Sequence, residues 1–445
     1  MSGKKQIKVA AGLGLEEPGP NSPDHSSQNN RNLPEQHQPA KSDLVIRKLL
    51  NFGRKLAAGY NKLQISHRGM YSIERLHAYQ AYCDKTSTVR AIAVCVLTPV
   101  PSLLAIVLIE CFPLRDPLLG WEANYMFWIR FYISGVLICI GLTYQATDMV
   151  DRVKISLLQR LVMSIVAMSI YVGTVMLVSY LWIFPVPFGI VLGIGPCFAV
   201  FLTALIVTIG PTTFKANPGL GDELKLQFYV LATEGAISVI YPAFSCVYLR
   251  ASSTGRAGLV LLLPVIKILT KNIVAWSSSH VEDCIPVVTV FSIEVFNALH
   301  PQGAQEENLE LIEGTLQLLF HCEYHALVEY VECAVPILFG VYLTILYQLP
   351  VHEYYPHTRD LEAGQLEGML MSLSVYVTLE VLSFVGMHMA LKRKFHLSAL
   401  YQLAFVLETH VVQLQSRMFV WIVFILQFTL AHYGVDFTFQ FAWLH

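Results

Sequence analysis

A stripe of histidine and glutamate side chains is the most chemically informative feature of this sequence. At 100° per residue, these side chains lie within one sector of about 80° on a helix. They are His321, His325, Glu329 and Glu332. Histidines four residues apart can share a metal ion, and such a stripe also suits proton transfer. The alternative is structural, with histidines at a membrane headgroup boundary and carboxylates that are protonated or paired. The sequence therefore marks candidates for an ion or proton pathway and assigns no metal.

The stripe lies in a stretch without basic residues. Between Lys271 and Arg359 there is no lysine or arginine, whereas eleven acidic residues and six histidines occur. A further glutamate of this stretch, Glu294, lies in an apolar run, where an unpaired charge is costly. Lys267 precedes the stretch and lies deeper in its own apolar segment than Lys271, which can reach a membrane interface. We therefore predict that Lys267 pairs with Glu294 or Glu329.

Two more carboxylates, Glu234 and Glu380, lie alone in the middle of apolar segments. Buried acids on several helices are typical of the polar pathways of transporters and channels. A hydrogen-bond network that stabilises a helix bundle explains them about as well. The candidates for an ion or substrate pathway are thus Glu234, Lys267, Glu294, His321, His325, Glu329, Glu332 and Glu380.

The composition requires a membrane to position these residues. Only 14% of the 445 residues are charged and 54% are hydrophobic, against about 25% charged in ordinary globular domains. Fourteen of the thirty lysines and arginines fall in the first 90 residues. A soluble core cannot absorb so many long apolar runs. We predict an all-α polytopic membrane bundle.

Residues 89–445 are expected to form this bundle, with about nine spans. The segment 285–299 is short for a crossing of about 20 residues, so eight or ten spans are also compatible with the sequence. Residues 400–414 are expected to form an amphipathic helix at the membrane interface. The first predicted span is interrupted by Pro99 and Pro101. The nine predicted spans are 91–110, 125–145, 161–183, 186–209, 226–249, 258–276, 326–348, 367–391 and 416–433.

The polar N-terminal region is expected to differ from the rest of the chain. Residues 1–43 are rich in Pro, Asn, Gln, Ser and Glu and are predicted to be disordered. Residues 44–88 are predicted to form basic amphipathic and juxtamembrane helices. A basic face on anionic lipid headgroups is one interpretation, and a helix packed on the protein itself is the other. The residues of that basic face are Arg47, Lys48, Arg54, Lys55 and Lys62.

The distribution of basic residues predicts an orientation. A cytoplasmic N-terminus places the loops that carry Arg152, Lys154 and Lys215 inside, and those that carry Arg115 and Arg359 outside. The basic run 392–394 is then cytoplasmic if 285–299 does not cross.

Known enzyme motifs are absent or incomplete. There is no HExxH zinc-protease motif, and the GxGD string at 219–222 has no Tyr-Asp partner. We therefore expect no enzymatic activity, no cofactor and no nucleic-acid partner. The lipid bilayer is the expected partner, and the sequence leaves a homo-oligomer open.

Four local strings are similar to a known family. They are residues 112–117 (FPLRDP), 120–124 (GWEAN), 128–130 (WIR) and 291–299 (FSIEVFNAL). They resemble a large paralogous family of uncharacterised polytopic transmembrane proteins of oomycetes, over most of the chain after residue 70. The resemblance implies a polytopic architecture and carries no activity.

Two functions follow from these observations. The first is a transporter or channel that handles a cation or protons through its buried carboxylates. The second is a membrane sensor, receptor or scaffold that transports nothing. Convergence of Glu234, Glu294, Glu329 and Glu380 on one cavity would favour the first, and separate helix contacts would favour the second.

Overall fold

The computed structural model describes residues 72–148, 150, 152–252, 259, 262, 265–266, 268–274, 276, 285–291, 315–395 and 397–436. All of them belong to one of the two units into which the chain divides, residues 58–445. The expected tail at 1–43 and the five basic residues of the expected lipid-surface helix lie outside the described residues. Lys267 and Glu294 lie outside them too, so the pairing of Lys267 with Glu294 or Glu329 stays a prediction.

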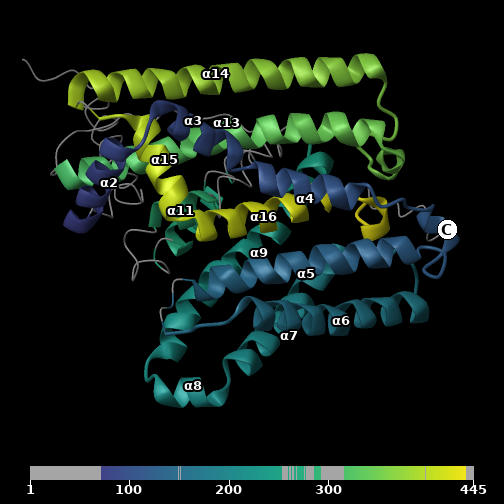
Figure 1. Cartoon of the computed structure of the whole chain (residues 1–445). Helices are drawn as coiled ribbons and strands as arrows, with labels where there is room; N and C mark the ends of the chain where they lie inside the picture. Colours follow the sequence, from purple (N-terminus) through teal and green to yellow (C-terminus); the bar gives the residue numbers. More distant parts are fainter. Residues whose placement is uncertain are drawn as a thin grey trace, which may run out of the picture. The chain divides into compact units, whose positions relative to one another are not determined.

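The described residues form helices and short 3-10 turns and contain no strand, which confirms the all-α class (Figure 1). The 3-10 turns are η2 (Pro117–Leu119), η5 (Pro350–Tyr354) and η6 (Ala431–Tyr433). The helices are α2 (Ile73–Lys85), α3 (Thr88–Leu97), α4 (Val100–Glu110), α5 (Tyr125–Thr147), α6 (Leu157–Leu181), α7 (Gly189–Ile209), α8 (Pro211–Ala216), α9 (Leu220–Arg250), α11 (Ile285–Thr289), α13 (Thr315–Gln348), α14 (Ala363–Phe395), α15 (Ala399–Thr409) and α16 (Val411–Gln427).

Six helices in the described part are long and apolar enough to cross a membrane. A seventh crossing results if α15 and α16, which are bent by 84°, count as one broken span. The expected count of nine is therefore not reached within the described residues, where the predicted span at 258–276 is only partly included. The six are α3 with α4, α5, α6, α7, α13 from Leu319 onward, and α14.

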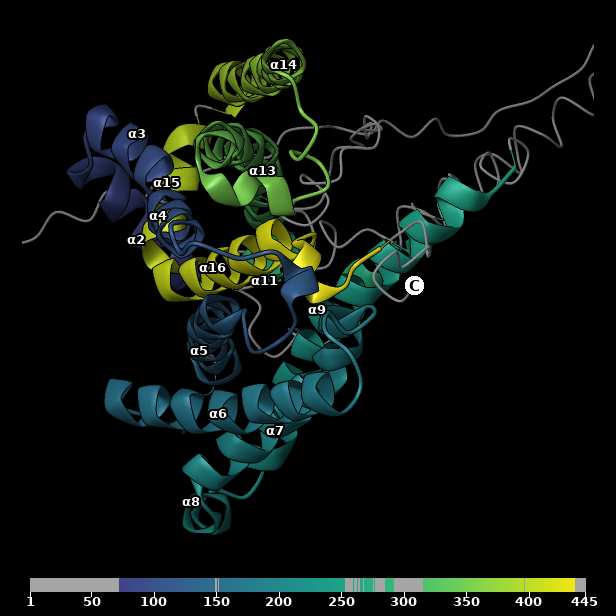
Figure 2. The same ribbon diagram turned by 90° about the vertical axis from the view of Figure 1, so that its right-hand side faces the viewer.

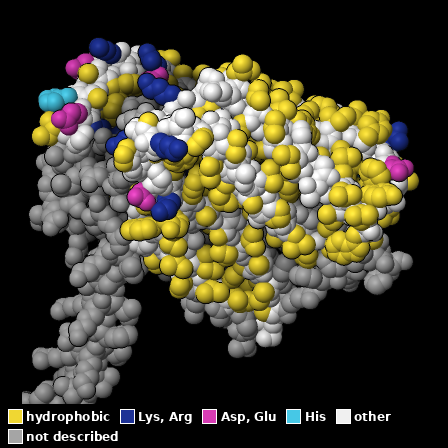
Figure 3. Space-filling model, turned by 90° about the horizontal axis from the view of Figure 1, so that it is seen from below, with side chains coloured by type: hydrophobic (Ala, Val, Ile, Leu, Met, Phe, Trp, Pro, Cys, Tyr) yellow, Lys and Arg dark blue, Asp and Glu magenta, His cyan; other side chains and the backbone are white. Residues whose placement is uncertain are grey.

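The surface of these helices is apolar. Large hydrophobic side chains that are more than half exposed occur on α3, α4, α6, α7 and α14, for example Leu104, Val207 and Leu382. In Figure 3 hydrophobic side chains cover most of the described surface, and charged ones gather toward its margins. Such a surface fits lipid and not water. The chain is thus a polytopic α-helical membrane protein.

Local sequence signals explain where several helices begin and end. The Ser156 hydroxyl and the Gln159 side chain form a reciprocal capping box at the start of α6. The expected interruption of the first span is confirmed, because α3 ends at Leu97 and α4 begins at Val100, after Pro99.

Two segments differ from what their hydrophobicity alone indicates. The interfacial helix expected at 400–414 is two helices, because α15 ends at Thr409 and α16 begins at Val411. Most of α15 is buried in the bundle, since it packs on α3 and α13. The described part of 285–299 forms the five-residue helix α11, whose continuation reaches Phe291. Val287, Val288 and Phe291 are fully buried, so this part faces protein and not lipid.

The helices pack in a chain of neighbours. α5 contacts α16, α6 and α9, and α6 also contacts α7. α13 contacts α14 and α15, and α14 runs along α13 in both views (Figures 1 and 2). α16 therefore lies between two groups of helices. It contacts α5 on one side, and it also contacts α4 and α11.

Four connecting segments gather at one end of the bundle. The backbone oxygen of Arg115 lies 2.8 Å from Nε2 of His432, and the ring of Tyr354 packs edge-on against His432 at 5.2 Å. The backbone N–H of Phe188 donates to the backbone oxygen of Gly434 at 2.8 Å and so adds the fourth segment. The four segments are 111–124, 182–188, 349–362 and 428–436.

The connections after α5 and after α7 meet at the opposite end, where the first turn of α16 also lies. The side-chain amide of Gln413 donates to Asp148 at 3.0 Å, and the guanidinium of Arg152 donates to the backbone oxygen of Pro218 at 3.2 Å. These contacts agree with the expectation that successive loops lie alternately at the two ends of the bundle. Which end faces the cytoplasm stays a prediction.

Candidate functional site

Three buried ion pairs each join two helices. The charged atoms lie 2.5, 2.7 and 3.6 Å apart, and no side chain of the six is more than 5% exposed. A charge in the hydrocarbon region is costly, and an oppositely charged partner offsets that cost. The pairs are Glu110 (α4) with Arg130 (α5), Arg75 (α2) with Glu323 (α13), and Glu234 (α9) with Arg417 (α16).

The first pair belongs to a wider hydrogen-bond network. The Nη2 group of Arg130 donates to Glu110 at 2.5 Å and to the Tyr355 hydroxyl at 2.7 Å. The hydroxyls of Tyr355 and Tyr342 both donate to the same Glu110 oxygen, at 2.8 and 3.2 Å. Burial raises the pKa of Tyr355 well above its usual value, so its hydroxyl keeps its proton. This network connects α4, α5, α13 and the segment after η5.

The third pair reaches the wall of a cavity. Nε of Arg417 lies 3.6 Å from Oε1 of Glu234, and Nη1 donates to the side-chain oxygen of Gln413 one turn earlier on α16. Glu234 lines a cavity of about 150 Å³ between α5, α6, α7, α9 and α16. The sequence-predicted carboxylate is thus part of a site, and an arginine balances its charge.

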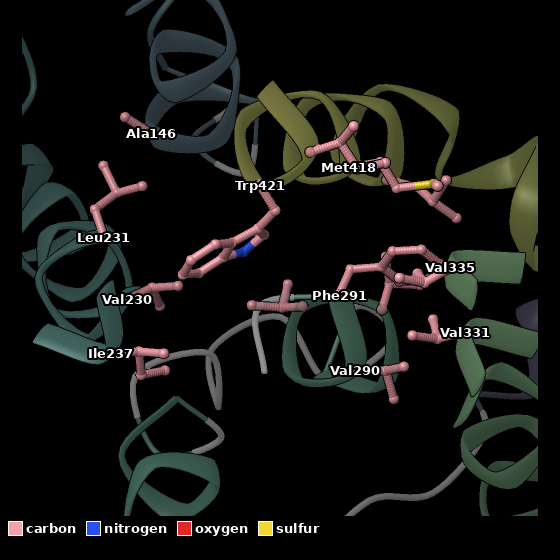
Figure 4. Packing of buried hydrophobic residues seen from close by; sticks show 14 of the residues in the cluster. Ala146, Val230, Leu231, Ile237, Val290, Phe291, Val331, Val335, Met418 and Trp421 are labelled. Atoms are coloured by element: carbon pink, nitrogen blue, oxygen red, sulfur yellow. The ribbon is translucent and has the colours of Figure 1, made fainter. Parts of the chain in front are cut away.

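The cavity walls are mainly apolar and aromatic. Figure 4 shows the indole of Trp421 extending from α16 toward Val230 and Leu231 of α9. Gly193 of α7 allows a close approach of α6, because a Cβ at this position would collide with the hydroxyl of Tyr171. The aromatic lining residues are Phe131, Tyr171, Phe198, Phe201, Trp421, Phe424 and Tyr433.

A small polar group interrupts this apolar lining. The hydroxyl of Ser134 lies 3.2 Å from both the oxygen and the nitrogen of the Gln427 side-chain amide. The hydroxyl of Tyr433 donates to the oxygen of the same amide at 3.2 Å. All three residues line the cavity and are buried. The amide of Gln427 is therefore held in place at the cavity wall.

The histidine and glutamate stripe does not reach this cavity. On α13, the rings of His321 and His325 lie edge-to-face with centroids 4.5 Å apart. Glu329 accepts a hydrogen bond of 3.1 Å from Ser383 of α14 and interacts electrostatically with Glu380.

The remaining member of the stripe, Glu332, lies on the same side of α13. Tyr376 of α14 interacts electrostatically with Glu380 and Glu332. Three of the predicted carboxylates thus meet at the contact of α13 with α14, neither of which lines the cavity. Among the described residues, no group of three or more His, Cys, Asp or Glu side chains is arranged to hold a metal ion.

Several residues of these clusters were not predicted from the sequence. Glu110 ends an apolar helix and Arg417 is the only charged residue of α16, so intramembrane position was a usable signal for both. Arg75 and Glu323 are separated by 247 intervening residues, which no local pattern connects. Gln427 carries no charge and gave no signal.

A buried histidine, His432, and a half-buried one, His357, lie at the end where the four segments gather. Nε2 of His432 lies 2.8 Å from the oxygen of Arg115 and 3.1 Å from Oδ1 of Asn124. The amide nitrogen of Asn124 donates to the backbone oxygens of Asp116 and Gly120, so the Asn124 atom that faces His432 is the oxygen. Both neighbours of Nε2 are therefore acceptors, and Nε2 carries the proton. Burial lowers the pKa of His432 and of His357 to about 4.

We expect this depressed pKa to make the protein acid-sensitive. The unfolded state binds a proton near pH 6.5 and the folded state near 4, so acid favours unfolding. For His432 the loss between pH 7.5 and pH 5 is roughly 2 kcal/mol. Thermal midpoints in detergent at the two pH values test this. His432→Gln should reduce the pH dependence of the thermal midpoint, whereas His77→Gln, at an exposed histidine, should not. The same pH dependence in wild type and both variants would show that His432 is not the acid-sensitive group.

Comparison of the chain with protein-family models, with curated proteins and with solved structures gives no match. The resemblance to the oomycete family stays an expectation, and function is argued from the geometry.

Proposed function

We propose that this membrane protein is a receptor or sensor that binds a small, largely apolar molecule within its helix bundle. The cavity between α5, α6, α7, α9 and α16 carries the proposal. Ligand sites are typically concave, mainly apolar and equipped with a few fixed polar groups, and this cavity has each of these properties.

The charges around the cavity favour this function over cation transport. Glu234 is the acidic residue of the cavity wall, and Arg417 lies 3.6 Å from it. A carboxylate with a fixed arginine partner attracts a cation less than a carboxylate alone. Glu329, Glu332 and Glu380 belong to another helix contact, so the described acids do not share one cavity. Separate contacts support the receptor interpretation.

Filling the cavity tests the proposal. Ile138 of α5 lines the cavity, whereas Ile129 of the same helix is 44% exposed. We expect Ile138→Trp to abolish binding of fluorobenzene to the protein in lipid nanodiscs, because the indole would occupy the space of the ligand. Ile129→Trp makes the same change on the outer surface and should leave binding intact. Fluorine NMR relaxation of the probe reports binding. Equal binding to wild type and Ile138→Trp would refute the proposal.

Proton or cation handling is a second candidate, supported by the carboxylates between α13 and α14. Glu329 and Glu380 lie close enough to interact between two membrane-length helices, where like charges favour a shared proton or a cation. A pH-sensitive dye in proteoliposomes would report proton flux. Glu329→Gln and Glu380→Gln should each abolish the flux, while Glu367→Gln, at an exposed position of α14, should not. Flux that persists in both variants would exclude this pathway.

A further inference from the structure

The size of the cavity suits a small ligand. The volume of about 150 Å³ equals that of engineered protein cavities that accept benzene. It is well below the range of roughly 300–1,000 Å³ typical of sites for drug-sized ligands. A molecule of one six-membered ring with a small substituent fits this space.

The walls favour a flat ring. Aromatic side chains approach from α5, α6, α7 and α16, including Phe131, Tyr171, Phe198 and Trp421. Aromatic pairs in offset or edge-to-face geometry contribute beyond the area they bury. A ring in the cavity can make such contacts with several walls at once.

The charge of the wall favours a neutral ligand. Glu234 and Arg417 are each no more than 5% exposed and lie 3.6 Å apart, so each offsets the charge of the other. A benzoate or a benzylammonium ion would lose its hydration in this cavity and bring a charge that the Glu234–Arg417 pair does not balance. Ionic ligands of the same size are therefore disfavoured.

The amide of Gln427 can recognise an oxygen substituent. Its oxygen accepts from Tyr433, and its nitrogen lies 3.2 Å from Ser134. An amide nitrogen has two hydrogens, so one can donate to Ser134 and the other to a ligand. Tyr433 and Ser134 fix the orientation of the amide before any ligand arrives.

From these four observations we propose that the cavity binds a neutral single-ring aromatic molecule whose hydroxyl or carbonyl oxygen accepts a hydrogen bond from Gln427. The inference rests on the proposed receptor function and adds the chemical class of the ligand. Phenols and small aromatic alcohols or ketones belong to this class.

Four fluorinated probes in nanodiscs test the class with the full-length protein. They are 4-fluorophenol, fluorobenzene, 4-fluorobenzoate and 4-fluorobenzylammonium, compared at pH 7 by fluorine NMR. We expect 4-fluorophenol to bind about fivefold more tightly than fluorobenzene, the gain of one buried hydrogen bond. The two ions should bind more weakly than either.

Variants assign the preference to Gln427. Gln427→Met keeps the size of the side chain and removes its donor, so within this variant 4-fluorophenol should bind no more tightly than fluorobenzene. Tyr433→Phe, which frees the amide from one partner, should reduce the preference partly and serves if Gln427→Met does not fold. Equal affinities of 4-fluorophenol and fluorobenzene for wild type, or a preference for an ion, would overturn the inference alone. No binding of any probe would overturn the proposed function with it.

Discussion

Arg130→Met is expected to destabilise the protein by roughly 3–5 kcal/mol, because it leaves a buried carboxylate without its cation. Arg130 is fully buried and its partner Glu110 is 1% exposed, so water cannot replace the lost contact. Tyr355 loses its guanidinium donor as well, although its hydroxyl still donates to Glu110. The free energy of unfolding in mixed detergent micelles measures the effect.

Two further proteins separate the ion pair from the loss of packing. In the double variant Glu110→Met and Arg130→Met no charge is left unpaired, so most of the stability should return. Arg90→Met removes an arginine from an ion pair with Glu408 whose side chains are 62% and 28% exposed, and should cost less than about 1 kcal/mol. A loss for Arg130→Met no larger than that for Arg90→Met would show that the buried pair contributes little.

Arg417→Met is expected to have the second large effect, on both stability and ligand preference. It should cost about 3 kcal/mol, toward the lower end for buried pairs because the contact with Glu234 is 3.6 Å long. The cavity wall would also lose the cation that lies beside Glu234. We therefore expect 4-fluorobenzylammonium to bind this variant better than it binds wild type.

Glu234→Gln in the Arg417→Met background tests the cause. A neutral amide needs no cation, so stability should recover and the gain in cation binding should disappear. Persistence of cation binding in the double variant would mean that another group attracts the ion.

The sequence predicted much of the helix content but not the contacts. The Pro99 interruption, the long helices and the alternation of loops follow from local rules of hydrophobicity and backbone geometry. The path after residue 395 cannot be predicted in this way, because α15 is apolar enough to lie either at the membrane interface or in the core of the bundle. Its contacts with α3 and α13 show that it lies in the core.

The site was predicted in part for a similar reason. Glu234 was recognised because a carboxylate in an apolar run is rare. Its partner Arg417 lies 183 positions later, and the sequence instead drew attention to Lys267 as a cation for the acidic stretch. The uncharged Ser134, Gln427 and Tyr433 become a group only when α5, α16 and η6 meet. Pairing across such distances is information that only the three-dimensional structure contains.

These separations have a consequence for how the protein is made. A ribosome adds roughly 5–20 residues per second, so Arg417 is synthesised about 10–40 s after Glu234, and Glu323 follows Arg75 by a similar or longer interval. During that time Glu234 and Arg75, the first-made member of each pair, reside at the insertion machinery or in the bilayer without their final partners. Nascent chains that stop before α16 should therefore be recognised by membrane quality control through the carboxylate on α9, and completion of α16 should relieve that recognition.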